Sequence, residues 1–333
     1  MLLSIIIATY NRANAVKELV EALEKQFAKL AIDFPKEKLS EEIELIVVDN
    51  NSQDDTGAIL FQKLSEQNRK KTDFLKLNYF LEIEQGSSPA RNRGIKEAKA
   101  NLLAFLDDDI ELDANWLKNV YQIALTKPEN LCQGGRVIPI WQAETLPEWL
   151  SLTPPYEIIQ SCFPAHDHGL NKKSYPFEFA DTARKIQNPI SACFICSKDI
   201  FLKHGDFRLD LGIKANERGA CEDTEFFWRL LKEKINVEYN PEITVLHPIV
   251  KEKISKDFVL KWYRLLGQTL EYMKDKKITH LNPEAEISPK PQLIIKLWLF
   301  RIIRIFSFTA KKSFWFDCQK SYTKGQIDYQ KSL

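Results

Sequence analysis

Short apolar runs alternate with amphipathic segments through the N-terminal half of the chain. Residues 3–8, 43–48, 74–80 and 102–106 are mostly apolar and have the length of buried strands. Between the first two runs, Val16, Leu19, Val20, Leu23 and Phe27 recur at the spacing of one helix face. A polar, proline-containing stretch over residues 31–42 extends that connection. The alternation predicts an α/β fold with a mostly parallel sheet covered by helices.

Two later helices have recognisable start signals. Ser88 is a predicted N-cap, and Pro89 suits the first position of the helix that follows the third strand. Asp113 is the predicted N-cap of a helix that follows the fourth strand. Further along, the pattern predicts a strand within 190–196, a helix near 198–204, a helix opened by Glu222 and strands around 237 and 243–247.

Residues 139–189 have no regular pattern and are rich in proline, histidine and aromatic side chains. A loop of this length in a compact domain is usually functional. Its aromatic side chains can stack on sugar rings or simply pack in a core, and the sequence leaves both interpretations open. The residues concerned are Trp141, Trp149, Tyr156 and Phe163.

The C-terminal portion is predicted to be helical, with helices over 255–273 and 293–308. The second is strongly apolar, but Lys296, Arg301 and Arg304 share one arc of it at about 100° per residue. From residue 290 to the end there are nine basic and two acidic residues, a net charge of +7 (9 − 2). This composition suits a helix lying on an anionic membrane surface, with residues 290–324 as the contact. A packed terminal helix or a dimer contact explains it equally well.

Composition narrows the class of protein. With 333 residues, of which 44% are hydrophobic and 28% charged, the chain can bury one large core or a core with a small appendage. Its 47 basic and 46 acidic residues create no overall field that would attract nucleic acid. The apolar first residues lack a basic leader, and no run of about 18 apolar residues occurs. We therefore expect a cytoplasmic protein, with peripheral attachment to the inner membrane face left open.

Six cysteines are scattered along the chain. Cys193 and Cys196 form a lone C-x-x-C within an apolar run, without the second pair that a zinc site needs. We expect buried structural thiols.

Three consecutive carboxylates, Asp107, Asp108 and Asp109, follow the buried run 102–106 directly. At the carboxyl end of a strand such groups repel one another unless a cation joins them. Oxygen ligands suit Mg²⁺ or Mn²⁺, and ligands of open α/β sheets bind at this edge. The alternative is a solvated acidic turn.

Other polar residues are predicted at the same edge of the sheet. Asp49 ends the second strand and, with Asn51 close by, can accept hydrogen bonds from a nucleotide base, although such turns are also common without a ligand. Arg91 and Arg93 lie near a predicted helix N-terminus, which together with guanidinium groups favours a diphosphate. As helix-surface charges they would be unremarkable.

Two acids and one histidine complete the candidate chemistry. Glu222 and Asp223 open an amphipathic helix, where the helix dipole alone accounts for acids. The functional interpretation is that Asp223 removes a proton from an acceptor hydroxyl, while the loop over 212–221, with two glycines, shapes or closes the site. His247 ends an apolar segment and is either a core or capping histidine or a neutral nitrogen ligand of the metal.

Taken in order, five segments resemble the family 2 glycosyltransferases of the GT-A fold. They are S-I-I-I-A-T-Y-N-R from Ser4, V-V-D-N-N-S from Val47, P-A-R-N-R-G from Pro89, L-D-D-D from Leu106 and C-E-D-T-E from Cys221. The resemblance covers roughly residues 1–250. Many members have a glycine before the Glu-Asp pair, where this chain has Ala220-Cys221, so the resemblance describes the donor site better than the acceptor site.

The resemblance implies a Rossmann-like catalytic domain over 1–250, and the helical pattern that follows it predicts a C-terminal extension over 251–333. Within the domain, residues 1–130 would bind the nucleotide sugar, and residues 131–250 would hold the acceptor and the catalytic acids. The implied donor-binding residues are Thr9, Tyr10, Arg12, Asp49, Asn51, Arg91, Arg93, Asp107 and Asp108. The implied metal ligands are Asp107, Asp109 and His247, Asp109 foremost, and the implied base is Asp223 with Glu222 beside it.

The resemblance also implies an activity. A sugar would pass with inversion from a UDP-, GDP- or TDP-sugar to a saccharide or lipid-linked acceptor, with Mn²⁺ or Mg²⁺ as cofactor, in polysaccharide or glycoconjugate synthesis. Two alternatives remain. A sugar nucleotidyltransferase is disfavoured because residues 8–12 contain no glycine for a phosphate loop. A nucleotide- or carbohydrate-binding protein without catalysis would not need the acid at position 223.

Overall fold

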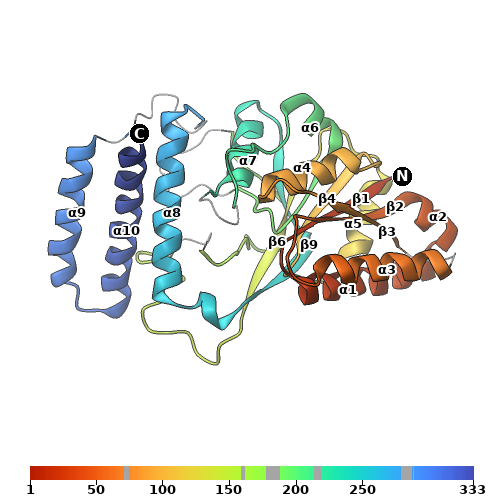
Figure 1. The fold of residues 1–333 in the computed structure, drawn as a ribbon, viewed down its shortest axis with the longest axis horizontal. Coiled ribbons are helices and arrows are strands. Elements are labelled where there is room, and N and C mark those ends of the chain that lie inside the picture. Colours follow the sequence, from red (N-terminus) through yellow and green to blue (C-terminus); the bar gives the residue numbers. More distant parts are fainter. Residues whose placement is uncertain (71–74, 159–161, 178–187, 214–218, 279–286, 288) are drawn as a thin grey trace. The chain divides into compact units, whose positions relative to one another are not determined.

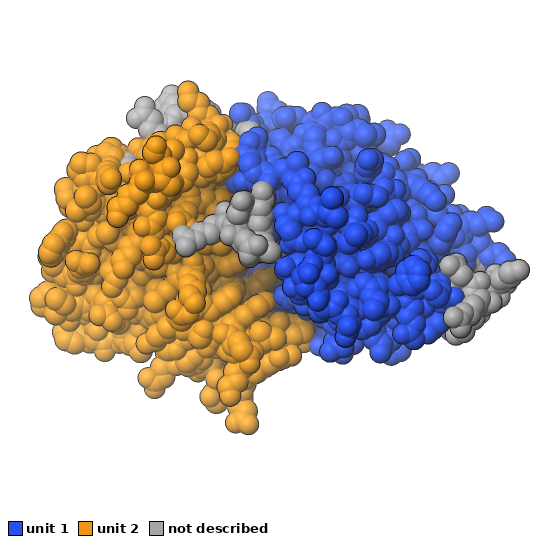
Figure 2. Space-filling model, viewed as in Figure 1, with its two compact units in different colours: residues 1–138, 165–216, 222–247 blue, residues 139–164, 217–221, 248–333 orange. Residues whose placement is uncertain are grey.

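The chain forms two compact units (Figure 2). The computed structural model describes residues 1–70, 75–158, 162–177, 188–213, 219–278, 287 and 289–333. Unit 1 comprises Met1–Ile138, Ala165–Asn216 and Glu222–His247, and unit 2 comprises Pro139–Pro164, Glu217–Cys221 and Pro248–Leu333. Unit 2 thus takes in two earlier segments as well as the C-terminal region that was expected to form the extension.

A mixed sheet lies at the centre of unit 1 (Figure 1). In the described residues its strands are β1 (Leu3–Thr9), β2 (Ile43–Asp49), β3 (Lys76–Leu81), β4 (Leu102–Asp107), β5 (Glu111–Leu112), β6 (Cys132–Trp141), β7 (Lys173–Ser174), β8 (Cys193–Ser197) and β9 (Val237–Ile249). Their order is β3-β2-β1-β4-β8-β6-β9-β5, and β7 pairs with β9. The first four strands are mutually parallel, whereas β8 runs antiparallel to both β4 and β6.

The four predicted N-terminal strands are confirmed as β1 to β4, although Phe74, the first predicted residue of the third, lies outside the described residues. The two segments predicted around 237 and 243–247 are in fact one continuous strand, β9. Strand β6, which ends within the region without a regular pattern, was not predicted.

Helices cover both faces of the sheet in unit 1. They are α1 (Ala13–Asp33), α2 (Lys36–Glu42), α3 (Thr56–Lys70), α4 (Ser87–Glu97), α5 (Trp116–Leu125), α6 (Lys198–His204) and α7 (Glu222–Lys232). One hydrophobic cluster joins the sheet to α1, α3 and α5, and a second joins its other face to α4, α6 and α7.

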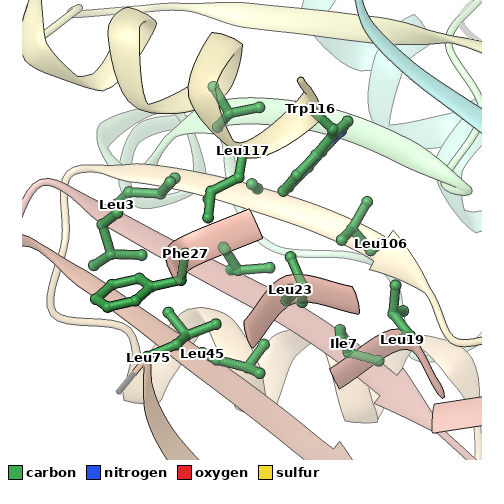
Figure 3. Close-up of a cluster of buried hydrophobic side chains, with 14 of the residues drawn as sticks. Leu3, Ile7, Leu19, Leu23, Phe27, Leu45, Leu75, Leu106, Trp116 and Leu117 are labelled. Carbon is green, nitrogen blue, oxygen red and sulfur yellow. The ribbon is translucent and has the colours of Figure 1, made fainter. Parts of the chain in front are cut away.

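Alternation along β1 decides which side chains enter which cluster. Leu3 and Ile7 pack in the cluster that holds α1, together with Leu23 of that helix (Figure 3). The side chain of Ile6 points to the other face of the strand and packs in the second cluster. There α4 approaches so closely that a Cβ added at Gly94 would lie 2.4 Å from Cγ2 of Ile6. Glycine is required at this contact, and α4 is therefore held directly above the sheet.

Three local predictions are wrong. Residues 31–42 are not a plain connection, since α2 forms there with Leu39 buried. Helix α4 begins one residue before the predicted cap, with Gly86 as N-cap, and the Ser88 hydroxyl instead donates to the Leu211 carbonyl at 3.1 Å. Helix α5 has Asn115 as N-cap, because the Asp113 carboxylate accepts from the Asn115 amide and closes a turn before the helix.

The cysteine prediction is confirmed. Cys193 and Cys196 form no disulfide and are fully buried. Burial raises the pKa of the Cys193 thiol to about 12.

Unit 2 contains the helices α8 (Lys256–Asp275), α9 (Lys290–Ile305) and α10 (Ala310–Ser332), after a short 3₁₀ helix at Lys251–Lys253. Helix α10 packs against both α8 and α9 (Figure 1). Glycines allow α8 and α10 to touch: a Cβ at Gly267 would lie 2.1 Å from the Tyr322 carbonyl oxygen, and one at Gly325 2.0 Å from that of Arg264. In the described part of the chain, no helix combines the length and the apolar character needed to cross a bilayer.

The four aromatic residues of the irregular region pack within unit 2. Trp141 contacts Phe163 with ring centroids 5.1 Å apart. Trp149 and Tyr156 contact aromatic side chains of α10 at 4.5 and 6.2 Å. Of the two interpretations of these residues, the packing supports the core.

Candidate active site

The carboxyl ends of three parallel strands bring the predicted polar residues to one edge. Thr9 is in register with Asp49 on β2, and Ala8 is in register with Asp107 on β4. Because parallel strands end at the same edge, residues almost a hundred positions apart become neighbours.

The turns after β1 and β2 interlock at this edge. Asn11 and Asn51 both have a positive φ, 52° and 61°, which asparagine adopts more readily than most residues. The Asn11 amide donates to the Ser52 hydroxyl at 2.9 Å, and the Gln53 amide donates to the Asn11 side chain at 2.7 Å. These bonds hold the backbone on either side of half-buried Tyr10 and partly exposed Arg12.

Asp49 is held by protein groups on both carboxylate oxygens. Its Oδ2 accepts from the Tyr79 hydroxyl at 3.0 Å, and its Oδ1 accepts from the Ser52 amide at 2.9 Å. Burial, followed by the Asp49 charge, raises the pKa of Tyr79 to about 12. Tyr79 therefore stays a neutral donor to Asp49, a role that the alternation of β3 alone does not indicate.

Asp107, Asp109 and His247 form a group that can hold a divalent ion. One ligand atom from each lies within 4.8 Å of the others, and Nε2 of His247 is 3.4 Å from Oδ1 of Asp109. His247 is brought here by β9, whose residue Leu246 pairs with Glu111 just beyond the acidic triplet. Two carboxylate oxygens and one imidazole nitrogen form a donor set that suits Mn²⁺, so these residues fit the implied metal.

Asp108 is not a member of this group and bonds to Thr9 instead. Its Oδ2 accepts from the Thr9 hydroxyl at 2.7 Å, and burial raises the pKa of its carboxyl to about 7. The Arg12 guanidinium lies 3.9 Å from Asp108 and forms a short ion pair with Asp109. Arg12 therefore offsets part of the negative charge of the triplet.

Arg91 links the metal-binding group to the predicted catalytic acids. Its two terminal nitrogens donate to Glu222 at 2.8 Å and to Asp107 at 3.0 Å, and the residue is only 8% exposed. Glu222 also accepts from the Ser87 hydroxyl at 2.8 Å. Arg93 is not brought to this network, since it pairs with Glu97 on its own helix at 2.9 Å.

Asp223 follows Glu222 in the first turn of α7. One oxygen accepts from the Ser191 amide at 3.0 Å and the other from the Thr224 amide at 2.6 Å. Burial and then the charge of Glu222 raise the pKa of Asp223 to about 6. A carboxylate with a pKa in this range can act as a general base near neutral pH.

The predicted closing loop over 212–221 is described only in part, because residues 214–218 lie outside the described residues. Its first residue, Gly212, has a φ of 96°, and a Cβ there would lie 2.6 Å from the Ser87 hydroxyl and 3.4 Å from the Glu222 carboxyl carbon. The start of this loop therefore passes directly over the Arg91–Glu222 network.

Residues 4–205 match the family model for glycosyl transferase family 2, and the chain belongs to that family. Membership of this family is what the five segments predicted.

Similar proteins are named as sugar transferases. The GalNAc(5)-diNAcBac-PP-undecaprenol beta-1,3-glucosyltransferase of Campylobacter jejuni is 32% identical over 122 residues, which cover 37% of this chain and 34% of that protein. The glucosyl-dolichyl phosphate glucuronosyltransferase of Haloferax volcanii is 22% identical over 272 residues, 78% of this chain and 73% of that protein. This chain thus spans about a third of the length of the C. jejuni relative.

Solved structures share the fold. The mannosyltransferase PcManGT of Pyrobaculum calidifontis, solved with GDP-Man and Mn²⁺, has a TM-score of 0.53 and 14% identity over 99% of this chain and 86% of that one. Residues 1–349 of S. aureus TarS, solved with UDP-GlcNAc, have a TM-score of 0.50 and 16% identity over 100% and 93%. The predicted GT-A fold, with its mostly parallel sheet and C-terminal helices, is confirmed.

Proposed function

We propose that this protein transfers a sugar, with inversion, from a nucleotide-diphosphate donor to an acceptor hydroxyl. The observation that supports this best is the chain of contacts in unit 1 that joins the metal-binding group to the acids of α7 through Arg91. Such a displacement needs positive charge beside the leaving group and a base for the acceptor proton. The metal-binding group and the buried Arg91 guanidinium can supply the first, and the Asp223 carboxyl of raised pKa the second.

In the proposed mechanism, Asp107, Asp109 and His247 hold a divalent ion, Mn²⁺ or Mg²⁺. When bound, such an ion would supply positive charge against the departing nucleoside diphosphate. Asp223 takes the proton of the acceptor hydroxyl, whose oxygen forms a bond to the anomeric carbon. The bond between that carbon and the diphosphate oxygen breaks on the opposite face, so that one displacement inverts the centre.

The other residues position these groups. Arg91 keeps Asp107 and Glu222 in place, since both carboxylates bond to its guanidinium. Glu222 in turn lies beside Asp223, and its charge helps to keep that carboxyl basic. Thr9, Tyr10, Arg12, Asp49 and Asn51 are the proposed donor-binding residues of the same strand ends.

The relatives suggest the substrates. PcManGT is solved with a GDP-sugar and TarS with a UDP-sugar, which supports these two among the UDP-, GDP- and TDP-sugars that we propose as donors. The C. jejuni relative is named for an undecaprenol-linked saccharide and the H. volcanii relative for a dolichyl phosphate. We propose a saccharide or lipid-linked acceptor, in glycoconjugate or polysaccharide synthesis.

Isothermal titration with UDP, GDP and TDP, with and without Mn²⁺, tests the donor site. One nucleotide should bind in a Mn²⁺-dependent manner. Asp109→Ala should remove this dependence, because it deletes the proposed metal ligand that lies next to His247. Asp257→Ala, which removes a carboxylate whose side chain is 76% exposed, serves as the control and should bind as the wild type does. Metal-independent binding that Asp109→Ala leaves unchanged would contradict the proposed site.

A further inference from the structure

The outward side of helix α9 exposes a continuous apolar surface. Within the described residues of this helix only Leu293 is buried. Trp298 is 59% exposed and Ile302 50%, and the residue that ends the helix, Ile305, is 77% exposed. We call this surface the α9 face, and its members are Ile294, Ile295, Trp298, Leu299, Ile302, Ile305 and Phe306.

The opposite side of α9 is the one that packs on α10. Leu293 is buried there, the Phe300 ring lies 6.0 Å from that of Phe316, and Arg304 pairs with Asp317 at 2.8 Å. At about 100° per residue, positions 293, 300 and 304 fall within about 40° of one another. Trp298 and Ile302 lie about 140° and 180° from Leu293 on the same wheel, so packing among the described residues of unit 2 leaves the α9 face uncovered.

Basic side chains border the α9 face on both edges. Measured from Leu293, Arg301 lies at about 80° and Lys296 at about 300°, and the apolar arc fills the space between them. The Arg301 guanidinium lies 5.4 Å from the Trp298 ring centroid, and the Lys296 ammonium 5.7 Å from that of Phe300. Their apolar stems can follow the surface while the charges reach its rim. Residues 290–316 contain no acidic side chain.

We propose that the α9 face binds the surface of an anionic lipid bilayer, with the helix lying in the plane of the membrane. An apolar arc with cations on both edges matches a boundary where acyl chains lie beneath anionic headgroups. The 16 residues of α9 extend about 24 Å, less than the roughly 30 Å of a hydrocarbon core, and the basic residues along it also disfavour insertion across the bilayer.

A second copy of the chain fits the α9 face less well. Two such faces in contact would bring the Lys296 and Arg301 rims together, and residues 290–316 offer no acid to pair with them. The proposal rests on the α9 surface alone and does not depend on the proposed reaction. If both hold, membrane binding keeps the enzyme in the layer where a lipid-linked acceptor would lie.

Flotation of the full-length protein with lipid vesicles tests the proposal. Vesicles that contain phosphatidylglycerol should carry the wild-type protein upward, whereas vesicles of phosphatidylcholine alone should carry much less. The double variant Trp298→Glu/Ile302→Glu should stay at the bottom. The matched control Ile32→Glu/Leu202→Glu introduces the same two charges at unit 1 side chains that are 83% and 79% exposed, and it should float like the wild type.

The electrostatic part has its own variant. Lys296→Ala/Arg301→Ala should lower partitioning to phosphatidylglycerol vesicles about 25-fold, because each basic residue near an anionic surface contributes roughly fivefold. The wild-type protein also gives a direct measurement: bromine-labelled lipids should quench tryptophan fluorescence, and Trp298→Phe should remove most of the quenching. This measurement does not depend on the folding of the glutamate variants.

Three results would overturn the proposal. The wild-type protein could fail to float with anionic vesicles, or the Trp298→Glu/Ile302→Glu variant could float as well as its control. The third is a wild-type dimer that does not float and that this variant converts into a monomer in light scattering, which would assign the α9 face to contact between copies.

Discussion

The surroundings of Asp223 predict how the rate of sugar transfer depends on pH. Burial and the neighbouring Glu222 charge raise the pKa of this carboxyl from 3.8 to about 6. Only the ionised form can accept the acceptor's proton, so the rate should fall as the pH falls through this value. About nine-tenths of the groups are ionised at pH 7 and about one-tenth at pH 5, which predicts a roughly tenfold lower kcat at pH 5. An unshifted aspartate would remain almost fully ionised at both values.

The assay is the initial rate of nucleoside diphosphate release from pH 5 to pH 8, with saturating donor, acceptor and Mn²⁺. Under saturation kcat reports on groups in the complex, whereas titration of Asp108, whose pKa is about 7, should act on donor binding and therefore on KM. Asp223→Asn should lower kcat about 10² to 10⁴-fold and leave donor affinity unchanged. Asp210→Asn, an exposed aspartate of the same unit, serves as the control.

The ionisation of Asp223 should change folding stability with pH in the opposite direction to activity. Because the folded state raises the pKa of Asp223, folding favours its protonated form, and the stability that this gives is complete below about pH 3.8 and lost as the pH rises through about 6. Activity from this group therefore rises over the interval in which its contribution to stability falls. A kcat that is constant between pH 5 and pH 7, or an unchanged profile in Asp223→Asn, would refute the assignment of the base.

Two predictions concern stability. Glu222→Ala should lower the free energy of unfolding by about 3–5 kcal/mol in urea denaturation, because it leaves the buried Arg91 guanidinium with only one of its two carboxylate partners. Glu222→Gln should lower it less. A loss below about 1 kcal/mol for the alanine variant would contradict a network that depends on the Glu222 charge. Gly267→Ala should lower the free energy of unfolding by about 1–3 kcal/mol in thermal unfolding followed by circular dichroism, because the added Cβ would collide with the Tyr322 carbonyl. Lys261→Ala, on the exposed side of α8, is the control. Equal melting temperatures of the two variants would show that the helices can separate without cost.

The parallel half of the sheet could be predicted because its signals are local. Each of the runs that became β1, β2 and β4 is buried along almost its whole length, and such runs differ clearly from the amphipathic segments beside them. The antiparallel half was less visible. The bounds of β6 and β9 depend on which distant strands they pair with, and a two-residue strand such as β5 exists only through its partner.

The candidate site divides in the same way. Short sequence motifs contain Asp49, the triplet 107–109 and Asp223, so the chemistry of these residues could be proposed from the sequence. The partners that orient them come from elsewhere in the chain: Tyr79 holds Asp49, and the Ser191 amide holds Asp223. Neither partner has a pattern of its own, because a backbone amide or a single hydroxyl becomes significant only once folding has placed it next to a carboxylate.

By itself, the sequence determined the order of the N-terminal elements, the carboxylates at the strand ends and the combination of apolar and basic residues in the helix near the C-terminus. Hydrophobic periodicity and motif spacing are properties of residues that are close in the sequence, so they can be recognised without a structure. Only the tertiary structure decided that Arg91 joins Asp107 to Glu222, that Arg93 does not reach them, and that α9 turns its apolar side away from α10. These are contacts between residues far apart in the chain, and their geometry is set by packing and strand register.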